Sequence, residues 1–204
     1  MDPIQLAPIL DNDVALDSTP QETDQELLER ILDGDGAAFS ALVEKYHPKI
    51  FRLVRGIIGD WHISEDVCQE VLTIIYRKLS SFRHRSQFST WVYRVSVNAA
   101  LKARKRKARF EAENLDGTHG LTSPGDRRGP ELEGNEVVEK LLLPLPENLR
   151  VAVVLREQGG LSYAEIADIL GCSRGAVEQR LHRAMVLLRS IWKDLGKEWK
   201  GQKK

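Results

Sequence analysis

Apolar residues recur at helical spacing through most of this chain, and no segment alternates as a β-strand would. The repeat starts near Gln25 and returns in a second block that starts near Val137. Apolar side chains three and four residues apart share one face of an α-helix, and this face needs a partner surface to bury it. Val151–Leu155 is partly β-branched, but helical signals flank it. The pattern therefore predicts an all-α protein.

A polar segment separates the two helical blocks. Residues 111–135 contain five Gly, two Pro and six acidic residues, a composition that favours a flexible linker. We therefore expect two small helical domains, residues 25–110 and 136–196, joined by that linker. A disordered acidic tail, residues 1–24, would precede them, and a basic tail, residues 197–204, would follow. The acidic tail either solubilises the chain or folds back on a basic segment and competes with nucleic acid.

Local signals indicate where helices of the first block bend and begin. Pro48 should lie at a bend between two helices. Ser64, with acidic residues directly after it, should cap a helix that runs to about Leu79. In that helix the polar residues fall opposite the apolar stripe and should form one outward face; they are Asp66, Gln69, Glu70 and Thr73.

The forty residues from Val71 to Phe110 contain no acidic residue but carry eleven Lys or Arg, although the whole chain is neutral, with 30 basic and 30 acidic residues. Such a local excess favours a polyanionic partner. Aromatic residues among the cations favour a nucleic acid that is partly single-stranded, because unstacked bases stack on rings. Trp91 also lies on the apolar stripe of its helix, so a core position is the alternative for it. A helix should run from about Ser86 towards Lys107, with Tyr93 off or at the rim of its apolar stripe.

Residues 162–181 have the spacing of a helix-turn-helix. Ala167 is small where two helices would cross, Gly171 falls where the turn requires a positive φ, and Ser173 is suited to cap the second helix. The inward set would be Val177, Leu181, Ala184 and Leu188. The outward set would be Gln179, His182 and Arg183, with Glu178 on the flank and Arg174 and Arg180 near phosphates. Such outward residues read base edges in the major groove, whereas an ordinary helical hairpin is the alternative.

Other features argue against several classes of protein. The apolar runs are shorter than the roughly 20 residues of a membrane span, and residues 1–29 lack the positive charge of a signal peptide, so we expect no membrane insertion and a cytoplasmic location. Cys68 and Cys172 lie far apart, without metal-ligand spacing. The loose acidic group around Asp66 lacks both a nucleophile–base pair and clustered metal ligands. We therefore expect no catalytic residue, no metal, no cofactor and no enzymatic activity.

Four motifs follow one another along the two blocks. They are Ser64-Glu-Asp-Val-Cys-Gln-Glu-Val71, then Ser81-Phe and Phe88-Ser-Thr-Trp-Val-Tyr-Arg-Val-Ser-Val-Asn98, then Leu143-Pro-Leu-Pro-Glu-Asn-Leu-Arg150, and then Gly160-Leu-Ser-Tyr-Ala-Glu-Ile-Ala167 with Gly171. In this order and spacing the chain resembles the sigma-70 family of RNA polymerase sigma factors, specifically the small extracytoplasmic-function (ECF) group. The resemblance covers about Gln25 to Leu195 and implies domains of the sigma region 2 and region 4 types.

The resemblance implies roles for three sets of residues. Those that would bind core RNA polymerase are Asp66, Gln69, Glu70 and Thr73. Those that would contact the −10 promoter element, where the loop captures a flipped base, are His84, Arg85, Ser86, Gln87, Trp91, Arg94, Asn98, Lys102 and Lys105. Those that would contact the −35 element are Ser173, Arg174, Glu178, Gln179, Arg180, His182 and Arg183.

The resemblance also implies partners and a function. The partners would be core polymerase, through its β′ coiled coil and β flap, promoter DNA and an anti-sigma factor. The chain would recognise the −35 and −10 elements and promote DNA melting. Glu178 departs from the family, which commonly has a basic or small polar residue there. A carboxylate accepts a hydrogen bond from cytosine N4 but repels phosphate, so Glu178 bears on which −35 bases are read and not on how the helix docks.

Two other functions remain open from the residues alone. One is a stand-alone helix-turn-helix regulator whose first domain senses a signal or dimerises. The other is a nucleic-acid enzyme. A sensor domain has no need of both an outward polar face around Asp66 and an acid-free aromatic segment, and this combination favours the sigma factor.

Overall fold

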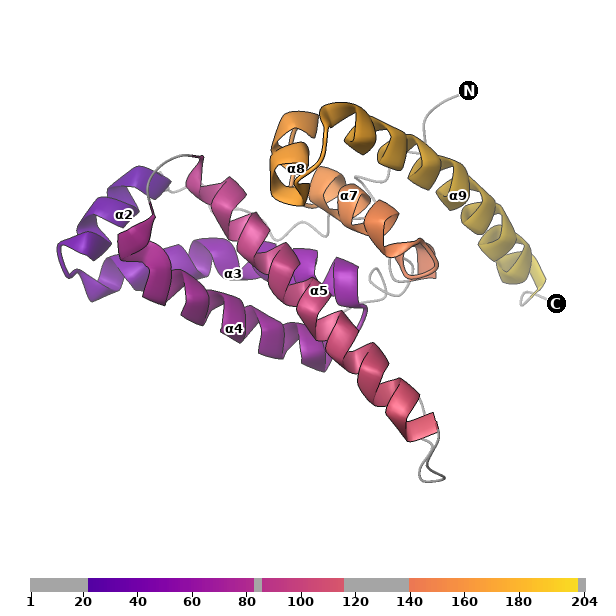
Figure 1. Cartoon of the computed structure of the whole chain (residues 1–204), viewed down its shortest axis with the longest axis horizontal. Helices are drawn as coiled ribbons and strands as arrows, with labels where there is room; N and C mark the ends of the chain where they lie inside the picture. Colours follow the sequence, from indigo (N-terminus) through magenta and orange to yellow (C-terminus); the bar gives the residue numbers. More distant parts are fainter. Residues whose placement is uncertain (1–21, 83–85, 116–139, 202–204) are drawn as a thin grey trace. The chain divides into compact units, whose positions relative to one another are not determined.

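The computed structural model describes residues 22–82, 86–115 and 140–201, and all regular structure in these residues is helical (Figure 1). The helices belong to two separate compact units, one in residues 22–115 and one in residues 140–201. Within these ranges no helix combines the length and the apolar character that crossing a membrane requires. The all-α prediction from the apolar spacing is confirmed.

Three long helices build the first unit. They are α3 (Gly36–Ile58), α4 (Trp61–Lys78) and α5 (Phe88–Leu115), and each packs against the other two (Figure 1). A short helix, α2 (Asp24–Leu32), packs on α3, and a 3-10 turn, η1 (Leu79–Ser81), follows α4. The apolar faces meet in a shared core that includes Leu42, Ile50, Leu53, Ile57, Val67, Cys68, Val71, Val92 and Ala100.

The turn between α3 and α4 differs from the prediction that Ser64 caps a helix. Gly59 ends α3 in the left-handed region, with φ 74°, and α4 begins two residues later. Asp60 is the cap, because its Oδ1 accepts a hydrogen bond from the Ile63 amide at 3.2 Å. Ser64 is fully buried inside α4, where its hydroxyl donates to the Asp60 carbonyl oxygen. The helix boundary is therefore the Gly59–Asp60 pair.

Two further expectations for the first unit are wrong. α3 runs through Pro48 as one helix, so this residue does not separate two helices. Tyr46 and Ile50 are buried on either side of it, and this burial offsets the hydrogen bond that the proline lacks. Tyr93 is 6% exposed and belongs to the core rather than to the rim of the α5 stripe.

The ends of two helices lie beyond their expected positions. α5 continues to Leu115, five residues into the segment 111–135 for which the composition predicts a linker. The C-terminal helix α9 (Arg174–Gly201) runs past residue 196. The remainder of the predicted linker, from residue 116, and the predicted acidic tail up to residue 21 lie outside the described residues.

The second unit consists of residues 140–142, which are helical, and of α7 (Glu147–Glu157), α8 (Tyr163–Leu170) and α9. α9 packs on both α7 and α8. α7 is buried from Leu149 to Leu155, and this stretch includes the charged residue Arg150. The Arg150 guanidinium donates to the carbonyl oxygens of Leu143 and Leu145 at 2.7 and 2.8 Å, so its charge orders the Leu-Pro-Leu-Pro turn that leads into α7.

Candidate nucleic-acid interface

One side of α4 is polar and exposed. Its members, called the α4 polar face below, are Asp66, Gln69, Glu70 and Thr73. The opposite side is buried, and burial raises the pKa of the Cys68 thiol there to about 12. The Thr73 hydroxyl donates to the Gln69 carbonyl oxygen at 2.9 Å. The charge of this face is carried by its two exposed acids, Asp66 and Glu70. The predicted division of α4 into an apolar and a polar side is confirmed.

Three aromatic rings meet where α5 begins. Phe82, Phe88 and Trp91 lie with their ring centroids 5.4–5.6 Å apart in every pair. Phe88 is 4% exposed and also contacts Tyr46 of α3, whereas Phe82 and Trp91 are half-buried. This aromatic cluster joins the two ends of the segment 83–87. Trp91 therefore packs on one side and is accessible on the other.

The predicted −10 residues of α5 fall on one face of the helix. At about 100° per residue, these side chains leave the helix within an arc of about 80° around its axis. We call this set the α5 stripe; its members are Trp91, Arg94, Asn98, Lys102 and Lys105, together with Arg109, which continues the register. The last four members are exposed, and Arg94 is half-buried. Of the other predicted −10 residues, Gln87 is exposed, Ser86 is half-buried, and His84 and Arg85 lie outside the described residues.

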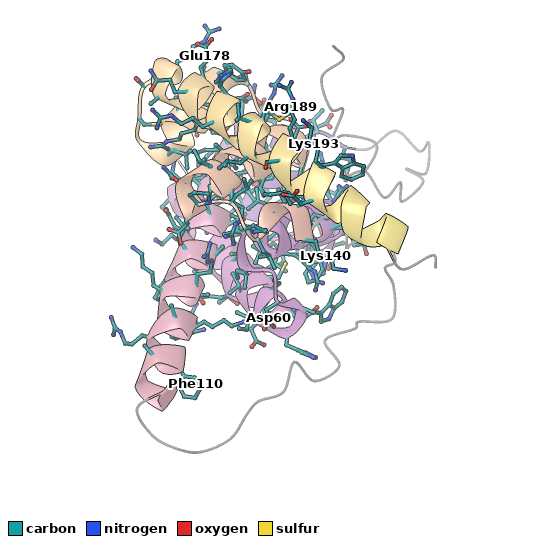
Figure 2. All side chains as sticks on the ribbon, turned by 90° about the vertical axis from the view of Figure 1, so that its right-hand side faces the viewer. Asp60, Phe110, Lys140, Glu178, Arg189 and Lys193 are labelled. Atoms are coloured by element: carbon teal, nitrogen blue, oxygen red, sulfur yellow. The ribbon has the colours of Figure 1, made fainter. Side chains whose placement is uncertain are left out.

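The structure divides the basic run Lys102–Arg109 between two faces. Lys107 lies about 160° round the helix from Trp91, on the side that faces the bundle. Its Nζ atom is 2.9 Å from Oδ2 of Asp60, and the two side chains are 25% and 11% exposed. Figure 2 labels Asp60 at the turn between α3 and α4. Lys102 has a looser contact, 3.9 Å from Glu70 of the α4 polar face, and its side chain is 77% exposed.

The α8–α9 pair has helix-turn-helix geometry. Ser162 caps α8 through a capping box with Glu165. α8 ends at Gly171, whose φ of 61° is the positive value expected at this turn. The Cys172 amide then donates to the Ala167 carbonyl oxygen at 3.0 Å. The Ser173 hydroxyl accepts a hydrogen bond from the Ala176 amide at 3.2 Å and so caps α9.

The orientation of α9 follows the prediction. The inward set is buried, with exposures between 0 and 8%: Val177, Leu181, Ala184 and Leu188. The outward set is exposed: Ser173, Arg174, Glu178, Gln179, His182 and Arg183, whereas Arg180 is half-buried. Figure 2 labels Glu178 on the first turns of this helix. Among the described residues, no group of three His, Cys, Asp or Glu side chains is placed to hold a metal ion.

Sequence reasoning missed Asp60. It caps α4 and also holds a cation of α5, and neither role was assigned to it. The signal was the pair Gly59–Asp60, since a glycine suited to a left-handed helix end directly precedes a good N-cap residue. The contact with Lys107, 47 positions away, has no signal in the sequence pattern.

Models of known families match both units of the chain. Residues 42–110 match sigma-70 region 2, and residues 135–188 match sigma-70 region 4. The RNA polymerase sigma-H factor of Pseudomonas aeruginosa is 40% identical over 178 residues, and the ECF RNA polymerase sigma-E factor of Escherichia coli K12 is 40% identical over 175 residues. Each match spans 80% of this chain and 91% of the relative.

Two solved structures have a similar fold. CnrH, in complex with the cytosolic domain of CnrY, has a TM-score of 0.65 at 23% identity, over 85% of this chain and 99% of that chain. The sigma factor RpoE from Bartonella quintana, in complex with the anti-sigma factor NepR, has a TM-score of 0.61 at 24% identity, over 76% of this chain and 96% of that chain.

Proposed function

This chain belongs to the sigma-70 family of RNA polymerase sigma factors, in its ECF group, and we propose that it directs core polymerase to promoters by reading the −35 and −10 elements and promoting DNA melting. The observation that carries this proposal is the combination on α5, where an exposed cationic stripe starts at an aromatic cluster. Cations hold phosphates and rings stack unpaired bases, so one helix offers both contacts that a melted promoter requires.

The α5 stripe is the proposed −10 surface. Trp91 supplies a half-accessible ring, Asn98 an amide for hydrogen bonds to a base, and Lys102 and Lys105 charges for phosphates. The segment after Phe82, with His84, Arg85, Ser86 and Gln87, is proposed to take the flipped base. Unstacking a base costs a few kcal/mol, and the aromatic cluster beside this segment can return part of that cost by stacking.

The start of α9 is the proposed −35 surface. Gln179, His182 and Arg183 face outward, where a recognition helix meets base edges. Ser173, Arg174 and Arg180 are proposed to hold phosphates. Glu178 is exposed beside them, and its carboxylate suits a cytosine amino group. Replacing Gln179 or Arg183 by Ala should relax specificity at one base pair, at a cost of about 1–3 kcal/mol.

The α4 polar face is the proposed contact with core polymerase, at its β′ coiled coil. Its support is the concentration of exposed acids and amides on a helix whose other side is fully buried. We propose that the second unit docks on the β flap. An anti-sigma factor is a further proposed partner, since the Bartonella quintana RpoE of similar fold was solved with one. These roles place the protein in the cytoplasm, as a polymerase subunit without catalysis of its own.

The test is promoter-dependent transcription by core polymerase with this protein added, read as heparin-resistant open complexes. Asp66→Lys and Glu70→Lys should abolish core binding, because both reverse charge on the proposed contact. Glu44→Lys is the matched control, a charge reversal at an exposed residue of α3. If core is neither bound nor redirected, while the protein alone binds one duplex sequence specifically, the chain is a stand-alone regulator and the proposal fails.

A further inference from the structure

The distal half of α5 leaves the bundle. In both Figure 1 and Figure 2 the helix runs on past the ends of α3 and α4. In this part the α5 stripe consists of Lys102, Lys105 and Arg109, all exposed. Residues 102–109 contain six Lys or Arg and no acidic residue, so this part of the helix has an excess of positive charge, although Glu70 of α4 lies 3.9 Å from Lys102.

Asp60 anchors the point where α5 leaves the bundle. Its Oδ1 atom caps α4 through the Ile63 amide, and its Oδ2 atom lies 2.9 Å from Nζ of Lys107. With 11% exposure the carboxylate is fixed in the turn between α3 and α4. The pair therefore ties the distal half of α5 to the two other helices, on the side opposite the stripe.

We propose that Asp60 is a positioning residue for promoter binding: by holding Lys107 on the opposite side of the helix, it directs the distal α5 stripe towards the phosphates of the DNA. The inference rests on the proposed −10 role of the proximal half of α5. Lys107 is not a phosphate contact in this arrangement. It is the anchor that directs Lys105 and Arg109 towards the DNA.

The absence of rings from the distal stripe indicates that its DNA is paired. The aromatic cluster lies only at Trp91, where unpaired bases need stacking surfaces. From Asn98 to Arg109 the stripe has no aromatic residue, and the exposed Phe110 lies about 100° round the helix from it. Trp91 and Arg109 are 18 residues apart, about 27 Å along the helix, which corresponds to about eight base pairs. The helix is long enough to extend from melted DNA into the duplex.

The deciding variant is Asp60→Asn, because the two possible roles of Lys107, anchor or phosphate contact, predict opposite changes in promoter affinity. Asn caps a helix as well as Asp does, so the α3–α4 turn is kept while the charge that holds Lys107 is lost. If Lys107 is an anchor, promoter affinity falls. If Lys107 is instead a phosphate contact that Asp60 masks, its release makes affinity rise, and the proposal is overturned.

Binding of the holoenzyme is measured against salt on two promoter duplexes. One is ordinary DNA; in the other, uncharged methylphosphonates replace the phosphates just upstream of the −10 element. Arg109→Gln should reduce the salt slope by about 0.9 on the ordinary duplex and leave it unchanged on the neutral one. Asp60→Asn and Lys107→Gln should weaken binding only on the ordinary duplex and speed amide exchange in residues 104–112. Lys107→Arg keeps the ion pair and should behave as the wild type.

Two results contradict the proposal even if every variant folds. One is an equal loss for Arg109→Gln on both duplexes, and the other is unchanged amide exchange in Lys107→Gln. Failure of the sigma role itself looks different, because the wild-type chain would then confer no promoter-dependent binding on core polymerase. In that case the free protein should still bind a plain duplex through the α5 stripe. Arg109→Gln should then reduce the salt dependence of this binding by the same amount.

Discussion

The substitution Gly→Ala should change the stability of the second unit differently at each of three glycines. At Gly171 a new Cβ would meet nothing within 4 Å, but φ is 61°. The cost is therefore conformational only, about 1 kcal/mol. At Gly175, in the first turn of α9, there is equal space and no positive φ, so Ala should stabilise by about 0.5–1 kcal/mol. At Gly159 the Cβ would lie 2.6 Å from the Leu155 carbonyl oxygen, and a clash with backbone should cost about 1–3 kcal/mol.

Native-state hydrogen exchange suits this test, because it reports the opening of one unit without requiring the whole chain to unfold in one step. The probes are the amides of Val177 and Leu181, whose side chains are buried in α9. A loss of about 1 kcal/mol corresponds to roughly fivefold faster exchange. The expected order of exchange rates is Gly159→Ala fastest, then Gly171→Ala, then wild type, with Gly175→Ala slowest.

The control at the turn is Gly171→Asn. Asn tolerates the left-handed conformation better than Ala does, so it should recover part of the loss. Unchanged exchange in Gly171→Ala would refute the argument that the positive φ determines the residue at this turn. Faster exchange in Gly175→Ala would refute the assignment of that position to an unstrained first turn of the helix.

Two further predictions concern buried groups of the first unit. Because burial raises the pKa of the Cys68 thiol to about 12, iodoacetamide at pH 8 should alkylate the half-exposed Cys172 and spare Cys68, as read by peptide mass spectrometry. Modification of Cys68 in the folded chain would show that the α3–α4 interface opens locally. Burial and the hydrogen bond to Asp24 raise the pKa of Tyr46, so it stays a neutral donor, and Tyr46→Phe should cost about 1–2 kcal/mol. Amide exchange should rise in α2, which this bond ties to α3; a change confined to α4 would contradict the assignment.

The helix-turn-helix was predictable because its signals are local. Ala167, Gly171 and Ser173 each answer a requirement of the backbone within one turn of the chain, and helical periodicity alone then determines that Gln179 faces outward. The same holds for the α4 polar face. These predictions depend on a period and on a cap, and distant residues do not change them.

The misses arose where the preference of one residue was outweighed, in one case by a neighbouring cap residue and in the other by burial. Ser64 is a good cap by type, but Asp60 caps the helix one turn earlier, and Ser64 is buried inside α4. Pro48 is a helix breaker by type, yet packing on both sides of it keeps α3 continuous. At Pro48, burial of the neighbouring side chains outweighed a local preference of about 3 kcal/mol.

By itself the sequence determined the helical class, the face that each helix buries and the turn chemistry of α8–α9, because period and backbone conformation are properties of neighbouring residues. Only the tertiary structure decided which cations of α5 are available to a ligand. Lys105 and Lys107 are alike in the sequence, but one is exposed and the other is held by a carboxylate 47 residues away. A contact across that separation depends on how α3, α4 and α5 pack, and no local pattern encodes it.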